Sequence, residues 1–182
     1  MWNKICIVLL AGVMGAMAAP AWSDNKLVTQ SVLPLAMARE AAAEALAQCR
    51  RDGYRVSVAV VDRSGVLRVL LRDDGAGVHT VDSSRRKAYT AASMREPTMK
   101  FAALIARLPQ LQGLRDMNES ILILGGGLPV RFGDEVVGGI GVGGAPGAHL
   151  DEHCARAGLL RIGAHPYEAQ SADSDAREDA GE

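Results

Sequence analysis

The sequence has few aromatic residues, little net charge and no local signature of several common enzyme classes. Phe, Trp and Tyr make up 4% of the 182 residues, and the formal net charge is −1. So few aromatic side chains argue against a platform that stacks nucleic-acid bases, and so small a charge argues against a nucleic-acid surface. The patterns G-x-S-x-G, G-x-x-x-x-G-K-[ST] and C-x-x-C-H do not occur. A serine hydrolase, a P-loop enzyme and a c-type haem attachment site are therefore not indicated.

Long apolar runs are also missing, apart from one at the N-terminus. There a single lysine precedes "ICIVLLAGVMGAMAA", and "PAWS" follows. This order is typical of a secretory signal peptide. We predict a signal peptide over residues 1–23 that is cleaved between Ser23 and Asp24, with cleavage after Ala18 or Ala19 as the second choice. The alternative is an uncleaved membrane anchor, but the run is short and rich in Gly and Ala for a span. We expect a periplasmic or secreted protein.

The remaining chain predicts one α+β domain over residues 24–168, followed by a polar, acidic tail over residues 169–182 that we expect to be disordered. Apolar periodicity and turn residues give the order α-β-β-α-α-β-β-β-α, in which residues 121–124, "ILIL", form a short strand of their own. Since the other strands come in hairpins, we expect a mostly antiparallel sheet that is covered by helices.

Two cysteines remain after signal-peptide removal, Cys49 late in the first predicted helix and Cys154 early in the last. In an oxidising compartment such a pair can form a disulfide. This bridge requires the first and last helices to pack side by side. The alternative is two reduced, buried thiols.

Two short motifs match known patterns weakly. "GIGVGG", residues 139–144, fits G-x-G-x-x-G, but its glycines fall partly inside a predicted strand. Glycines that let a strand approach another backbone closely are the simpler interpretation. "HLDEH" places His149 and His153 four residues apart, so on a helix both could bind one divalent metal. The alternative is two solvated histidines at a helix start.

His79 lies in "RDDGAGVHTVDSSRRKAYTA", residues 72–91, between a glycine loop and a predicted helix. Arg85, Arg86 and Lys87 follow within two turns. A neutral imidazole can bind tetrapyrrole iron, and nearby cations can bind propionates or a phosphate. The spacing by itself favours the simpler alternative, a polar loop residue ahead of an ordinary basic helix face.

Several stretches together resemble the GlcG/HbpS family, which includes the C-terminal domain of PduO-type proteins. They are "VSVAVVDRSGVLRVLLRDDGAGVHT", "SSRRKAYTAASMREPT", "GGGLPVRFGDEVVGGIGVGGAPG" and "DEHCARAGL". The resemblance covers residues 33–164. It implies a profilin-like sandwich with a five-stranded antiparallel sheet, and homo-oligomers such as rings or octamers. It also implies haem as the ligand, with corrinoid binding among relatives.

The resemblance makes His79 and Thr80 the candidates for contact with the iron. Some haem-binding relatives use a histidine of the first helix, but this chain has none between Val32 and Gly53. We therefore expect an exported haem-binding protein that senses, stores or buffers haem without turning over a substrate. One or two members of the cation run Arg85, Arg86 and Lys87 would pair with the propionates.

Two other functions stay open at this point. One is a small enzyme or accessory subunit that acts on a hydroxy- or keto-acid, with Arg72 and the glycines forming an anion pocket. The other is a structural oligomer whose loops bind a partner protein. A corrinoid and a divalent metal are weaker alternatives for the ligand, and nucleic acid is not expected as a partner.

Overall fold

The computed structural model describes residues 27–165, so the expected signal peptide and acidic tail lie outside the described residues. The elements are α1 (Leu35–Arg51), β1 (Ser57–Asp62), β2 (Leu67–Arg72), α2 (His79–Met94), α3 (Thr98–Arg107), the 3-10 helix η1 (Pro109–Arg115), β3 (Gly127–Phe132), β4 (Glu135–Gly143) and α4 (Ala148–Arg161). Within this part of the chain no helix is both long and apolar enough to cross a membrane.

The strands form one antiparallel sheet in the order β2-β1-β4-β3. The predicted α+β class is thereby confirmed, but the expected fifth strand over residues 121–124 is wrong. The N–H of Leu122 in this segment donates to Thr90 Oγ1 at 2.8 Å, while Ile121 and Ile123 pack into an apolar cluster around Ile105. The segment therefore satisfies its backbone and buries its side chains against helices, without joining the sheet.

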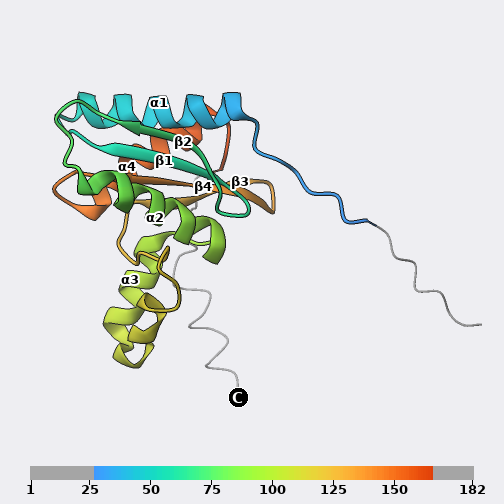
Figure 1. Cartoon of the computed structure of the whole chain (residues 1–182), viewed down its shortest axis with the longest axis vertical. Coiled ribbons are helices and arrows are strands. Elements are labelled where there is room, and N and C mark those ends of the chain that lie inside the picture. The colour runs from blue at the N-terminus through green and yellow to red at the C-terminus, as the bar shows by residue number, and fades with distance from the viewer. Residues whose placement is uncertain (1–26, 166–182) are drawn as a thin grey trace, which may run out of the picture. The chain divides into compact units, whose positions relative to one another are not determined.

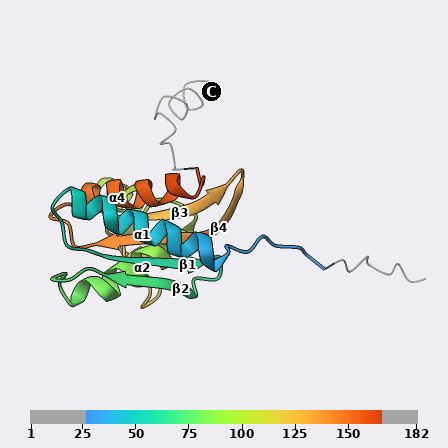
Figure 2. The same ribbon diagram turned by 90° about the horizontal axis from the view of Figure 1, so that it is seen from above.

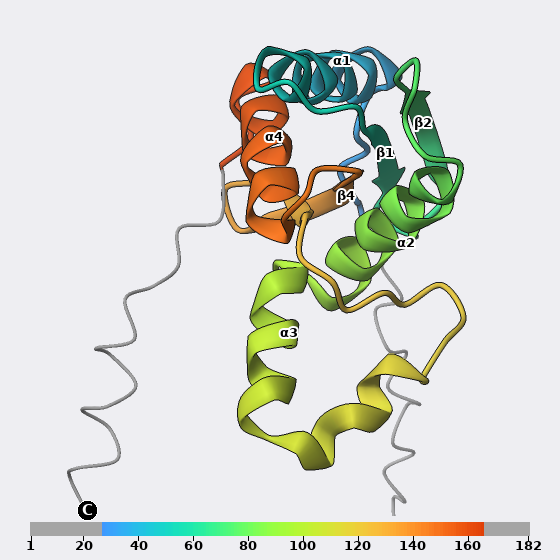
Figure 3. The ribbon, with the colours of Figure 1, turned by 90° about the vertical axis from the view of Figure 1, so that its left-hand side faces the viewer.

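Helices cover both faces of this sheet. Figures 1 and 2 show α1 and α4 side by side over one face, with α2 on the other. Figure 3 shows that α3 lies beyond α2, farther from the strands. The larger core lies between the sheet and the α1–α4 layer and includes Val58, Val60, Leu128, Ile140 and Leu159. Inward-facing residues that alternate along the strands supply this core, as expected for a sheet with a buried face.

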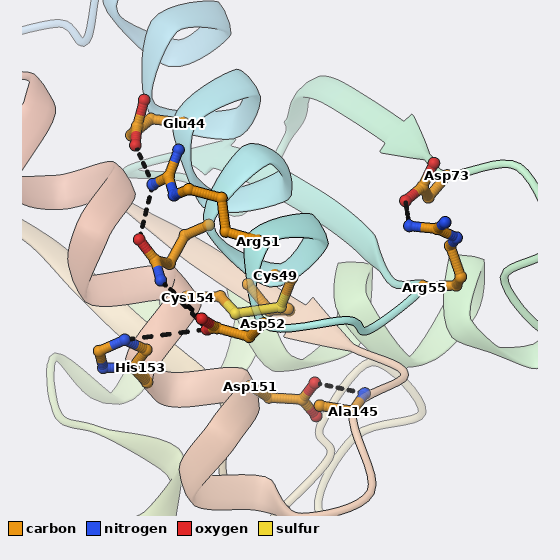
Figure 4. Close-up of a disulfide and its surroundings, with 12 residues drawn as sticks. Glu44, Cys49, Arg51, Asp52, Arg55, Asp73, Ala145, Asp151, His153 and Cys154 are labelled. Carbon is orange, nitrogen blue, oxygen red and sulfur yellow. Dashed lines mark hydrogen bonds and ion pairs between the residues drawn. A yellow bond between two sulfur atoms is a disulfide. The ribbon is translucent and has the colours of Figure 1, made fainter.

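A disulfide joins α1 to α4. Cys49 and Cys154 are bonded to each other, with their Cα atoms 5.5 Å apart (Figure 4). The helices can approach this closely because small residues face each other. A Cβ atom on Gly158 would lie 2.4 Å from the carbonyl oxygen of Ala41. Of the two alternatives left open by the sequence, the structure contains the bridge.

The glycines of "GIGVGG" bring α2 against β4. A Cβ atom on Gly139 would lie 2.2 Å from the carbonyl oxygen of Ala88, and one on Gly141 would lie 2.2 Å from that of Ser84. Both glycines lie within β4, which pairs antiparallel with its two neighbours. A dinucleotide site instead needs its glycines at the turn of a βαβ unit. These glycines therefore serve helix–sheet packing.

Candidate functional site

His79 is the first residue of α2, and its side chain is exposed. The loop that precedes it is held at both ends. Buried Asp73 accepts a hydrogen bond from Arg50 Nε at 2.9 Å, and Arg72 Nε donates to the carbonyl oxygen of Ala76 at 3.0 Å. The histidine therefore follows a braced loop. Arg72, the arginine considered for an anion pocket, acts as part of this brace.

Gly77 leaves room for the imidazole. A Cβ atom at this position would lie 2.6 Å from Cε1 of His79 and 2.9 Å from its Nδ1. The next residue, Val78, is 78% exposed and adds an apolar surface beside the ring. The start of α2 thus presents one accessible imidazole next to an exposed apolar side chain.

Thr80, the second iron-contact candidate, is buried. Its Oγ1 lies 2.7 Å from Oγ of Ser57 and donates to the carbonyl oxygen of Gly77 at 2.6 Å. These contacts tie the first turn of α2 to β1. A ligand approaching His79 from solvent cannot reach this hydroxyl, so the structure does not place Thr80 with His79 as a surface contact.

The three cations of the run differ in exposure, and Lys87 is the one whose side chain is turned away from solvent. Its side chain is buried, and Nζ donates to Asp151 Oδ2 at 2.8 Å and to the carbonyl oxygen of Val142 at 2.9 Å. The second carboxylate oxygen of Asp151 accepts the N–H of Ala145 at 3.0 Å (Figure 4). Burial raises the pKa of the Asp151 carboxyl, and the Lys87 ammonium opposes that rise. Lys87 therefore holds the fold together.

Arg85 and Arg86 stay at the surface. Nη2 of Arg85 donates to Asp82 Oδ1 at 3.1 Å, whereas Nη2 of Arg86 donates to the carbonyl oxygen of Ile121 at 2.6 Å. Since α-helices have 3.6 residues per turn, Arg86 lies two turns after His79 on the same face. Arg85 projects from a neighbouring face, so Arg86 is the better placed of the two for a ligand held by His79.

The two histidines of "HLDEH" both belong to α4 and line a pocket of about 270 Å³. His149 is exposed, and Nε2 of His153 lies 3.9 Å from Asp52 Oδ2 at the end of α1 (Figure 4). Among residues 27–165, no group of three or more His, Cys, Asp or Glu side chains is arranged to hold a metal. The pair is thus present on one helix without a third ligand.

Asp151 was not recognised in the sequence as the partner of Lys87. A signal was present on the lysine side. Thr80, Ser84, Lys87 and Ala91 recur at helical spacing, and all four are buried. Lys87 therefore lies on the buried face of this helix among small side chains. A buried ammonium group is costly unless an acidic side chain pairs with it. Which acid pairs with Lys87 depends on the contact between α2, β4 and α4, which spacing does not specify.

Comparison with known proteins gives a family. The sequence profile of the HbpS-like family, described as "Haem degrading protein HbpS-like", matches residues 33–160. This chain is 44% identical in sequence to a double mutant of HbpS from Streptomyces reticuli, for which there is a crystal structure. The structural match covers 80% of this chain and 97% of the HbpS chain, with a TM-score of 0.70.

Two further crystal structures have the same fold. ORFY from Klebsiella pneumoniae is 32% identical and covers 78% of this chain and 97% of its own, with a TM-score of 0.72. A complex named PduOC:Heme is 21% identical and covers 76% of this chain and 100% of its own, with a TM-score of 0.70. At that identity the last comparison concerns the fold alone. The resemblance noted in the sequence is confirmed.

Proposed function

This chain belongs to the HbpS-like family, and we propose that it is an exported haem-binding protein that senses, stores or buffers haem. A protein of the same fold has been crystallised with haem, which supports a tetrapyrrole as the ligand. We further propose that the chain forms a homo-oligomer, in which a neighbouring copy covers the exposed surface around His79. The predicted signal peptide supports a location in the periplasm or outside the cell.

The exposed imidazole of His79 is the observation that carries this proposal. A neutral imidazole nitrogen is a common axial ligand of haem iron. Val78, beside it, would contact the porphyrin face, and Arg86, on the same face of α2, would pair with a propionate through its guanidinium. The iron would supply the spectroscopic and redox properties, while these residues bind and orient the group.

Titration of the purified chain with haemin tests the proposal. We expect a saturable Soret band whose position reports a nitrogen ligand, and we expect His79→Ala to shift the band and weaken binding about tenfold or more. His153→Ala is the matched control, because it removes an exposed histidine from α4. If His79→Ala leaves both the spectrum and the affinity as in the wild type, His79 is not the axial ligand. If the wild type does not bind haemin saturably, the haem proposal itself fails.

The family description mentions haem degradation, so the same complex should be followed over time with ascorbate and oxygen. A stable Soret band is the outcome expected for sensing, storage or buffering. Steady loss of the band, with a bilin-like absorbance in its place, would contradict that role and favour an enzyme.

Export is tested by expressing the full chain in a Gram-negative host and measuring the mass of the product in the periplasmic fraction. Cleavage between Ser23 and Asp24 predicts a chain that begins at Asp24. A protein that keeps Met1 and sediments with membranes would contradict cleavage and favour the uncleaved anchor.

A further inference from the structure

A second pocket, of about 460 Å³, lies at the end of the sheet where both hairpins turn. Arginines from three separate parts of the chain line it: the β1–β2 turn, the end of α2, and β3. The lining residues are Arg63, Arg95, Arg131, Phe132, Asp134, Glu135 and Val136. Arginine is the side chain best suited to carboxylate and phosphate groups, because its planar fork can donate two parallel hydrogen bonds.

One of these arginines is already neutralised. Arg63 forms an ion pair with Glu135 through Nη2 and donates from Nε to the carbonyl oxygen of Val136 at 3.1 Å. Glu135 also accepts a hydrogen bond from Oγ of Ser31 at 2.5 Å. The contacts with Ser31 and Arg63 hold the pKa of the Glu135 carboxyl below its usual value. The carboxylate of Glu135 is thus ionised and paired with Arg63, so it does not neutralise Arg95 or Arg131.

Arg131 and Arg95 keep their charges for the pocket. Among the described residues, the guanidinium of Arg131 donates to two backbone carbonyl oxygens, that of Arg95 at 3.2 Å and that of Asp134 at 3.5 Å. In the described part of the chain, the guanidinium of Arg95 has no hydrogen-bond or ion-pair partner. The remaining acid, Asp134, is exposed on the β3–β4 turn. The lining therefore carries an excess of positive charge.

The backbone of Arg95 supports a binding role for its side chain. Its φ is +58°, and among residues 27–165 no other non-glycine residue has a positive φ. This left-handed conformation is unfavourable for an L-residue that has a side chain. Glycine and asparagine tolerate it better and commonly end helices in this way. An arginine here projects a long cation at the end of α2, while its carbonyl oxygen accepts the hydrogen bond from Arg131.

We propose that this pocket binds a small organic dianion that carries carboxylate or phosphate groups. Arg95 and Arg131 would bind the charged groups, and Phe132 would contact a short carbon skeleton. The site is separate from the proposed haem site, because Arg95 and His79 stand at opposite ends of α2. At 1.5 Å per residue, this helix separates them by about 24 Å. The proposal therefore does not depend on whether the chain binds haem.

Calorimetric titration of the wild type with succinate and with inorganic phosphate at low ionic strength tests the site. We expect saturable binding of at least one anion, which Arg95→Ala weakens about tenfold, because this variant removes charge-assisted hydrogen bonds to the anion. Arg39→Ala is the matched control, because it removes an exposed arginine of α1 and gives the same change in net charge. We expect its affinity to stay within about twofold of the wild type. Thermal unfolding without ligand verifies that both variants are folded.

Arg131→Lys adds a second test, because it keeps the charge and removes the planar fork. A clear loss of affinity in this variant supports recognition of the anion by geometry, whereas unchanged affinity contradicts it. Binding of succinate alone identifies a carboxylate ligand, and binding of phosphate alone identifies a phosphate ligand. The proposal is overturned if neither anion binds saturably at concentrations of tens of millimolar, or if Arg39→Ala weakens binding as much as Arg95→Ala does.

Discussion

Nζ of Lys87 lies 2.8 Å from Oδ2 of Asp151, and both side chains are almost fully buried. The lysine belongs to α2 on one side of the sheet and the aspartate to α4 on the other, so the ion pair links the two helical layers. Gly126 makes room for it, because a Cβ atom there would lie 2.7 Å from Cβ of Asp151 and 3.1 Å from Nζ of Lys87. Backbone groups complete the site, since Val142 accepts from the lysine and Ala145 donates to the aspartate.

Lys87→Met should destabilise the protein by about 3–5 kcal/mol, because it leaves the Asp151 carboxylate buried without its counter-charge. Replacing both partners, as Lys87→Met with Asp151→Leu, should recover part of that loss. Urea denaturation measures each free energy of unfolding. Arg85→Ala is the control for a surface ion pair and should change stability by less than about 1 kcal/mol. A cost below about 1 kcal/mol for Lys87→Met would show that the pair does not stabilise the layers.

Removing the disulfide should also destabilise the protein. Cys49 and Cys154 are 105 residues apart in sequence. A disulfide that closes a loop of that length stabilises the folded protein by about 4–5 kcal/mol, because it lowers the entropy of the unfolded chain. We expect Cys49→Ala with Cys154→Ala to unfold at a clearly lower temperature than the oxidised wild type. Reduction of the wild type should give a similar drop. Alkylation followed by mass spectrometry of protein purified without reductant checks the bridge, and two freely modified thiols would contradict it.

The sequence predicted the hairpins and helices well because their signals are local. "DRSG" marks the turn between β1 and β2, and "FGDE" marks the one between β3 and β4, where the structure has both turns. The predicted strand over residues 121–124 failed for a tertiary reason. Two of its apolar residues, Ile121 and Ile123, are buried against α3 and η1, and Thr90 of α2 accepts a hydrogen bond from the N–H of Leu122. Neither contact can be seen in the segment itself.

The candidate site was only partly predictable. His79 became the leading candidate through the family resemblance, because its place between a glycine loop and a helix start by itself favours a polar loop residue. Whether the neighbours of His79 can contact a ligand depends on the direction of each side chain, which the sequence does not give. Thr80 contacts Ser57 and Lys87 contacts Asp151. Arg86 donates to the carbonyl oxygen of Ile121. The arginine pocket could not be predicted, because Arg63, Arg95 and Arg131 meet only when the two hairpin turns and the end of α2 converge.

Asp73 should make stability fall in acid. Its pKa is lowered mainly by the hydrogen bond from Arg50. Because the folded-state pKa is lower than the unfolded one, the contribution is complete above the unfolded value of about 3.8. It is then lost as the pH falls from there through the folded-state value. Asp73→Asn should therefore be less stable than the wild type at neutral pH, with a flatter pH dependence below about pH 4.

Arg50→Gln tests the cause of that acid dependence. It keeps Asp73 and removes the donor, so its unfolding free energy should also vary less with pH in the acid range. Since the Arg50 side chain is 50% exposed, added salt should weaken the effect in the wild type. An acid slope of wild-type size in Arg50→Gln would mean that another group is responsible.

Gly141→Ala should destabilise the protein, because the added methyl group would push α2 away from the sheet. A Cβ atom there would lie 2.2 Å from the carbonyl oxygen of Ser84 and 2.5 Å from the N atom of Ala88. Both contacts are with backbone atoms of a helix that cannot move without losing its own packing, so Gly141→Ala should cost about 3 kcal/mol, the upper part of the range for overpacking. Gly113→Ala is the control, because η1 leaves open space around its Cβ position. Chemical denaturation compares the two, and equal stabilities would mean that α2 does not rest on the glycines of β4.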